Sequence, residues 1–237
     1  AALSAVREAT LADLAEGTPD ARYIDLFKVK YDYHNVKALL KAEAVGTAPD
    51  RMLMDMGRVS TAELAEAVRS RELDGLPETL AAAVAEAREG LDTTRDPQLS
   101  DIVLDRWCYR DMAALAEETG SAFLRGYVAV QVDAVNLRTA VRTLRMGKGA
   151  DFLLGALLEG GDLAPDAVAK AASSGAAGLR ELYGATRFRD AAEAGAEALK
   201  GGPLTAFEKL CDDAVGDYLA GAQSVPFGEA PLVSYLA

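Results

Sequence analysis

Apolar residues recur mainly at intervals of three and four along this chain, which is the spacing of one face of an α-helix. Between residues 99 and 118 the apolar set follows this spacing: Ile102, Leu104, Trp107, Cys108, Met112 and Leu115. Thr61 and Pro165 stand where helices commonly begin, and most other prolines fall between the periodic segments. The pattern predicts an all-α fold.

Two stretches, residues 24–33 and 127–132, nearly alternate between apolar and polar positions and could form strands instead. Their β-branched residues are compatible with a strand. Both stretches, however, run into helical patterns with no glycine or proline between. A long helix with a bulky amino-terminal half is the simpler interpretation, and we expect helices at both places.

The sequence repeats itself at a distance of just over 100 residues. A motif of the form Asp-x-x-Asn-apolar-basic returns after 101 residues, and a second similar segment, which holds a cysteine, returns after 103. The matched positions are Asp32 with Asp133, Asn35 with Asn136, and Cys108 with Cys211. Such self-similarity indicates stacked or closed helical units of about 100 residues that bury a shared apolar face.

Further matches set the limits of these units. Gly57-Arg58-Val59 matches Gly161-Asp162-Leu163 at an offset of 104, and Leu3, Leu11 and Leu14 match apolar positions of a later closing helix. The opening Ala1-Ala2-Leu3 has no methionine, so we expect a trimmed segment. We expect four parts: the closing helix of a first lobe at 1–15, helical lobes at 16–118 and 119–223, and the start of a return segment at 224–237.

Asn35 and Asn136 lie inside apolar helical patterns, where asparagine is mildly unfavourable. Its presence at both matched positions favours an amide that bonds a neighbouring element. Direct contact with a partner protein is the alternative.

Basic residues follow each asparagine at intervals of three or four, so that they share about a third of the helix circumference. These candidate partner-binding residues form the basic stripe: Lys37, Lys41, Arg138, Arg142, Arg145 and Lys148. One interpretation is a solvated face that favours the helix carboxyl terminus through its dipole. The other is a surface for an acidic partner.

The overall charge narrows the possible partners. The 237 residues carry a net charge of −12, and half are hydrophobic, which indicates a globular protein. No window approaches 18 uninterrupted apolar residues. The acidic balance argues against general binding to nucleic acid or anionic lipid. Two cysteines are no disulfide scaffold, and a reducing compartment is the expected setting.

Candidate chemistry is sparse. His34 is the single histidine, which excludes metal sites built from two or three histidines of this chain. Asp212, Asp213 and Asp217 resemble the metal-binding aspartates of all-α prenyl-diphosphate enzymes, but the third is one residue out of that pattern and no second cluster completes a site. Both cysteines lie in apolar helical faces, where inert buried thiols are expected. We expect no catalytic site, no metal and no cofactor.

The repeated motif carries a family resemblance. The segments YDYHNVKALLKA (residues 31–42) and VDAVNLRTA (residues 132–140) resemble the two internal signatures of the C subunit of the prokaryotic V-type (archaeal-type) ATPase/ATP synthase. The eukaryotic counterpart is the d subunit of the vacuolar proton pump. The segment EAPLVSYL (residues 229–236) resembles the lead-in to the last conserved helix of that family. The similarity covers nearly the whole chain.

This resemblance implies a funnel of three all-helical lobes around a pseudo-threefold axis, with the first and last lobes incomplete here. It implies a non-catalytic rotor coupling without a cofactor. The expected partners are the central shaft of the soluble ATPase head and the proteolipid rotor ring, on whose cytoplasmic end the protein sits. An unrelated soluble helical scaffold or adaptor is the alternative, and a prenyl-diphosphate enzyme ranks third.

Overall fold

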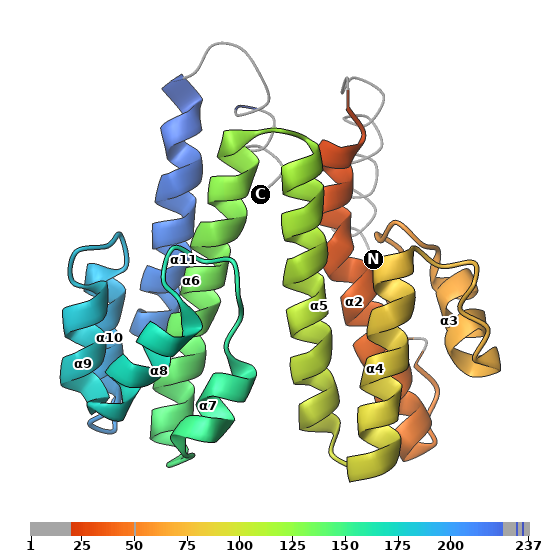
Figure 1. Ribbon diagram of the computed structural model, residues 1–237, viewed down its shortest axis with the longest axis horizontal. Coiled ribbons are helices and arrows are strands. Elements are labelled where there is room, and N and C mark those ends of the chain that lie inside the picture. The colour runs from red at the N-terminus through yellow and green to blue at the C-terminus, as the bar shows by residue number, and fades with distance from the viewer. Residues whose placement is uncertain (1–19, 50, 225–230, 232–233, 235–237) are drawn as a thin grey trace. The chain divides into compact units, whose positions relative to one another are not determined.

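The computed structural model describes residues 20–49, 51–224, 231 and 234, and all regular structure in this part of the chain is helical (Figure 1). The all-α prediction is confirmed. None of the described helices combines the length and the apolar character needed to cross a bilayer. The helices are α2 (Arg22–Val45), α3 (Thr61–Ser70), α4 (Glu78–Thr94), α5 (Pro97–Glu118), α6 (Ala122–Arg145), α7 (Ala150–Ala156), α8 (Pro165–Ser173), α9 (Gly175–Tyr183), α10 (Arg189–Ala198), α11 (Thr205–Ala220) and the 3-10 turn η1 (Gly221–Ser224).

The described chain divides into two compact units between Gly120 and Ser121. Unit 1 contains α2 to α5, and unit 2 contains α6 to α11 with η1. The lobes predicted at 16–118 and 119–223 stay a prediction. The predicted closing helix at 1–15, with its matched leucines, and most of the return segment at 224–237 lie outside the described residues.

Unit 1 is organised around α2, which contacts α3, α4 and α5. Half of the 24 residues of α2 are buried, among them Ile24, Phe27 and Tyr33. A helix covered on several sides does not carry a single narrow apolar stripe, and this explains why residues 24–33 looked like a strand. Residues 127–132 belong to α6 in the same way, so helix formation is confirmed at both places.

Helix α5 covers α2 and α4 with a stripe of buried residues spaced by four. These residues are Leu104, Cys108, Met112 and Ala116. Trp107, expected on the same apolar face, is only half-buried, and its indole N–H donates a hydrogen bond to the Glu86 carboxylate at 2.7 Å. The apolar face of α5 is therefore narrower than its sequence suggests.

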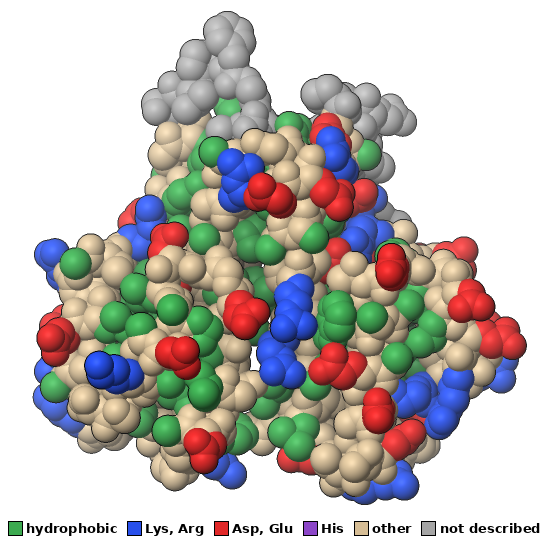
Figure 2. Space-filling view, viewed as in Figure 1, with side chains coloured by type: hydrophobic (Ala, Val, Ile, Leu, Met, Phe, Trp, Pro, Cys, Tyr) green, Lys and Arg blue, Asp and Glu red, His purple; other side chains and the backbone are tan. Residues whose placement is uncertain are grey.

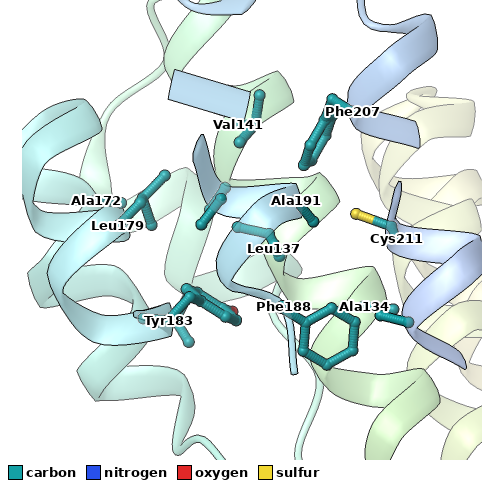
Figure 3. Packing of buried hydrophobic residues seen from close by; sticks show 14 of the residues in the cluster. Ala134, Leu137, Val141, Ala172, Leu179, Tyr183, Phe188, Ala191, Phe207 and Cys211 are labelled. Carbon is teal, nitrogen blue, oxygen red and sulfur yellow. The ribbon is translucent and has the colours of Figure 1, made fainter. Parts of the chain in front are cut away.

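Unit 2 encloses a mainly aliphatic core, with the aromatic rings of Tyr183, Phe188 and Phe207, between α6 and the shorter helices that follow it. Figure 3 shows Leu137 of α6 together with Phe207 and Cys211 of α11 in one buried cluster. The rings of Tyr183 and Phe188 meet edge to face with their centroids 6.3 Å apart, which is a favourable aromatic geometry. Helix α6 thus has the central position in unit 2 that α2 has in unit 1.

The two long helices also end alike. Gly46 follows α2 with φ 71°, and Gly147 lies just past α6 with φ 66°. Glycine adopts this left-handed conformation without the steric cost that a Cβ imposes.

Gly178 of α9 allows a close approach to α8, and this predicts an unequal response to two glycine substitutions. A Cβ at Gly178 would lie 2.1 Å from the carbonyl oxygen of Ala171, a backbone atom that cannot turn aside. We expect Gly178→Ala to lower the free energy of unfolding by about 1–3 kcal/mol or more. Gly216→Ala, on α11 in open space, should raise it by about 0.5–1 kcal/mol.

Urea denaturation followed by circular dichroism measures both changes. Because each variant replaces a helical glycine with alanine in the same unit, propensity acts equally in the two. Equal effects on stability would contradict the tight packing of α9 on α8.

Candidate functional site

The two repeated asparagines make the same pair of hydrogen bonds. In unit 1 the Asn35 side chain donates to the carbonyl of Met54 and accepts from the backbone N–H of Met54, both at 2.8 Å. In unit 2 Asn136 makes both bonds to Leu158, again at 2.8 Å. Each amide therefore pairs with both backbone polar groups, the N–H and the carbonyl, of one residue in the segment that follows the long helix.

One helical turn earlier, the repeated aspartates hold the next part of that segment. Asp32 accepts hydrogen bonds from the backbone N–H groups of Arg58 at 2.9 Å and Val59 at 3.2 Å. In unit 2, Asp133 accepts hydrogen bonds from the backbone N–H groups of Asp162 at 3.1 Å and Leu163 at 3.2 Å. These two residues match Arg58 and Val59 at an offset of 104. Aspartate and asparagine share one helix face because they are three residues apart. Together they form the Asp–Asn anchor of each unit.

Each anchor requires a glycine opposite the aspartate. A Cβ at Gly57 would lie 2.0 Å from a carboxylate oxygen of Asp32, and one at Gly161 would lie 2.2 Å from a carboxylate oxygen of Asp133. Any larger residue would push the carboxylate out of place. The sequence match between these two glycines therefore has a steric cause.

Unit 1 surrounds its anchor with a buried ionic network. Arg58 lies 2.9 Å from Asp32 and 2.6 Å from Asp111, whose carboxylate also accepts a hydrogen bond from the Tyr33 hydroxyl at 3.2 Å. Burial raises the pKa of Asp32, and the hydrogen bond from Arg58 acts against that rise. Burial works to lower the pKa of Arg58, but hydrogen bonds to Asp111 and Asp32 outweigh it, so this pKa is raised. The guanidinium stays charged and balances the carboxylates.

Unit 2 has the same anchor in a different electrostatic setting. Asp162 occupies the position that matches Arg58, and Ala214 occupies the position that matches Asp111. Burial raises the pKa of Asp133 to about 6, and the two backbone N–H groups counteract this only in part. The Tyr183 hydroxyl is buried without a hydrogen-bond partner in the described residues, and burial, followed by the charge of Asp133, raises its pKa.

The basic stripe pairs with acidic residues of its own unit. In unit 1, Lys37 lies 2.5 Å from Asp105, and Lys41 lies 2.6 Å from Asp101. Both carboxylates belong to α5, so the two pairs join α5 to α2. The first half of the stripe is therefore a seam between two helices.

The same seam joins α6 to α11 in unit 2. Arg138 lies 2.9 Å from Glu208 and 2.5 Å from Asp212, and Arg142 lies 2.7 Å from Glu208. Glu208 is the residue that matches Asp105 of unit 1 at the offset of 103. The repeat therefore extends to this one charge partner, whereas Leu204 stands at the position that matches Asp101.

The last two members of the stripe have neutral partners. Arg145 donates a hydrogen bond to the carbonyl of Gly202 at 2.8 Å, and the Lys148 ammonium lies 5.5 Å from the centre of the Phe152 ring. Figure 2 shows one face of the molecule, on which basic side chains are interspersed with acidic ones. Much of the stripe's charge is balanced within each unit, and its binding to a partner stays a prediction.

Both cysteines lie beside this seam. Cys108 of α5 and Cys211 of α11 are buried, and burial raises the pKa of each thiol to about 12. The thiols are therefore protonated near neutral pH, and a protonated buried thiol is a weak nucleophile.

Two of the aspartates that suggested a metal cluster have cationic partners. Asp212 pairs with Arg138, and Asp213 lies 2.5 Å from Lys209 one turn away on the same helix. These carboxylates take part in the ion pairs of α11 and its neighbour α6.

Comparison with known proteins points to one family. The family model described as ATP synthase (C/AC39) subunit matches residues 2–237. The C subunit of the V-type sodium ATPase of Enterococcus hirae is 24% identical over 240 residues, which cover 99% of this chain and 71% of the relative. The C subunit of the V-type ATP synthase of Thermus thermophilus is 30% identical over 175 residues, which cover 67% of this chain and 54% of the relative. The alignment thus takes in only about half of the Thermus protein.

The unbalanced carboxylate of unit 2 predicts a pH-dependent stability. The folded-state pKa of Asp133, about 6, lies above the ordinary value of 3.8, so the folded protein binds this proton more tightly than the unfolded chain. Its contribution therefore makes the protein less stable as pH rises from about 4 through 6. We expect Asp133→Asn to raise the free energy of unfolding by about 1–3 kcal/mol at pH 8 relative to its effect at pH 4.

Asp32→Asn is the matched comparison in unit 1. It leaves the largely buried Arg58, whose side chain is 13% exposed, with one carboxylate less, and removing one partner of a buried ion pair costs about 3–5 kcal/mol. We expect this loss at both pH 5 and pH 8. Urea denaturation from pH 4 to pH 8, with amide hydrogen exchange to separate the two units, measures both variants. A gain in stability from Asp32→Asn at pH 8 would contradict the electrostatic difference between the units.

Proposed function

The chain belongs to the ATP synthase (C/AC39) subunit family, and we propose that it is the rotor coupling subunit of a V-type ATPase or ATP synthase. In this role it joins the central shaft of the soluble ATPase head to the rotor ring in the membrane. The observation that carries the proposal is the extent of the family match, which runs over residues 2–237 and not over one motif. The relatives from Enterococcus hirae and Thermus thermophilus are named as C subunits of V-type complexes and support it.

The proposed partners follow from this role. One is the set of shaft proteins, and the other is the proteolipid ring. Attachment to the ring would hold the protein at the cytoplasmic face of the membrane. The net charge of −12 supports protein partners over nucleic acid.

The internal bonding of each unit suits a part that transmits torque. A coupling must resist bending, and a connecting segment that is fixed at two points moves less than one fixed only at its ends. The Asp–Asn anchors fix such a segment in both units, and the ion-pair seams join the long helices to α5 and α11. These bonds support a mechanical role.

We propose further that the chain is non-catalytic and works without a cofactor. The buried amides of the repeats, Asn35 and Asn136, are engaged in structural bonds. The thiols of Cys108 and Cys211 are protonated near neutral pH because their pKa values are about 12. A helical scaffold outside this family is disfavoured because the family model matches almost the whole chain.

A removal and add-back experiment tests the coupling role. Membranes that carry the complex but lack this protein should keep ATP hydrolysis by the soluble head and lose ATP-driven ion transport. Adding the purified full-length protein should restore transport, and the purified protein alone should hydrolyse no ATP. Undiminished ion transport in membranes that lack the protein would refute the coupling role.

The stripe can be tested separately from folding. Arg142 and Arg145 are exposed, so changing both to Gln should alter the free energy of unfolding by no more than about 0.5 kcal/mol per site. If they face a partner, two exposed contacts of about 0.2–1 kcal/mol each would weaken binding about two- to thirtyfold. This loss should shrink as salt rises above about 0.15 M.

Arg138→Gln is the control for stability. This arginine is only 18% exposed and spans two carboxylates of α11, so its loss should destabilise the protein by about 1–3 kcal/mol. Binding to the isolated shaft and to the detergent-solubilised ring is measured over a salt series. Parent-like binding of the Arg142→Gln/Arg145→Gln variant at every salt concentration would exclude these two arginines from the interface.

A further inference from the structure

A cavity of about 590 Å³ opens in unit 1, lined by residues at the carboxyl-terminal ends of α2 and α4 and by Arg71, which follows α3. Figure 1 shows these three helices. Three arginines line it, namely Arg71, Arg88 and Arg95. Leu91 and Val45 add apolar surface, and Val45 is 74% exposed although it is a large hydrophobic residue. The cavity therefore combines cationic and apolar groups, in a chain whose net charge is −12.

Two of these arginines stand where the backbone favours glycine. Arg71 follows α3 with φ 65°, and Arg95 follows α4 with φ 59°. Among the described residues, these are the only two other than glycine with a positive φ. The left-handed conformation brings the Cβ of an L-residue close to the following carbonyl oxygen, a strain that glycine avoids.

Unit 2 makes the corresponding turns with glycine. Gly175, 104 residues after Arg71, has φ 67°, and the left-handed residue after α10 is Gly201, with φ 102°. Unit 2 therefore forms the corresponding turns without arginine. Both strained arginines of unit 1 line one cavity, and we attribute their presence to what the cavity binds.

The charges in the cavity do not cancel. Arg88 is mostly buried and forms a two-pronged pair with Glu43 at 2.8 and 2.9 Å, so these two charges balance each other. Arg71 lies 3.8 Å from Asp92, which is beyond hydrogen-bond distance, and both side chains are more than half exposed. Arg95 has no ion pair within the described part of the chain. Three arginines against two carboxylates leave one positive charge in excess.

We propose that this cavity binds a single carboxylate side chain of a partner protein, in a segment that also carries apolar residues. One excess positive charge matches one carboxylate better than a doubly charged phosphate. The guanidinium forks of Arg71 and Arg95 suit the planar carboxylate, and Leu91 and Val45 suit its apolar neighbours. The inference rests on the proposed function only in that the partner is sought among the proteins of the same complex.

Because the backbone at Arg71 and Arg95 is strained, a variant can remove both charges without a loss of stability. Glycine at both positions removes the two guanidinium groups and relieves the left-handed strain, so Arg71→Gly/Arg95→Gly should melt at or above the temperature of the parent. Its affinity for the shaft or for the ring should fall about two- to thirtyfold at low salt. The matched control is Arg69→Gln/Arg106→Gln, which removes two arginines of the same unit from outside the cavity and should bind like the parent.

The outcomes separate this inference from the proposed function. A parent protein that binds neither shaft nor ring refutes the proposed function. A parent that binds, together with a stable double glycine variant that binds equally well, overturns the cavity as a binding site. Equal losses in the glycine variant and the control overturn it too, because they show a general effect of charge.

A peptide titration tests the chemistry of the ligand without any partner protein. The probes are acetyl-Leu-Glu-Leu-amide, the same peptide with Gln in place of Glu, and inorganic phosphate. The Glu peptide should shift the NMR signals of the Arg71 and Arg95 side-chain N–H groups at lower concentration than either other probe. Equal shifts from the Gln peptide, stronger shifts from phosphate, or no shift with the Glu peptide overturn the carboxylate assignment.

Discussion

Each unit depends on polar side chains that a long helix buries in order to bond the backbone of the segment leaving it. Buried N–H and carbonyl groups outside a helix need partners, and each group left unpaired costs about 1–3 kcal/mol. Asn35 and Asn136 supply two bonds to one peptide position, and the aspartate one turn earlier supplies two more. The position of α3 or α8, and the need for glycine beside the aspartate, follow from these bonds.

The two units solve the same electrostatic problem differently. A carboxylate in the interior must be balanced by a cation or keep its proton. Burial raises the pKa of both aspartates, but Arg58 opposes the rise at Asp32 in unit 1, whereas only backbone N–H groups oppose it at Asp133 in unit 2, whose pKa reaches about 6. The anchor therefore works in either protonation state, because the backbone N–H groups donate to an oxygen in both. The geometry is repeated while the charge balance is not.

The periodicity and self-similarity of the sequence predicted most of the fold, because helix faces and repeats leave regular spacings in the sequence. The matched Asp32, Asn35 and Cys108 positions pointed to bonds and burial that recur in both units. The Arg58–Asp111 pair was not foreseen, since 53 residues separate its members and no spacing rule joins them. The internal pairing of Arg138 was missed for a related reason: its partners lie on a helix that follows far later, and a cationic stripe looks the same whether its charges are paired or free.

Each unit contains one buried thiol, and the reactivity of these two thiols can report local unfolding of each unit. A reagent that alkylates thiols can reach Cys108 or Cys211 only when the surrounding helices separate, since both are buried. The two alkylation rates would therefore measure how often each unit opens by itself, in a single sample and without an added label. For a chain made of two similar units, that comparison tells which one yields first under heat, denaturant or load.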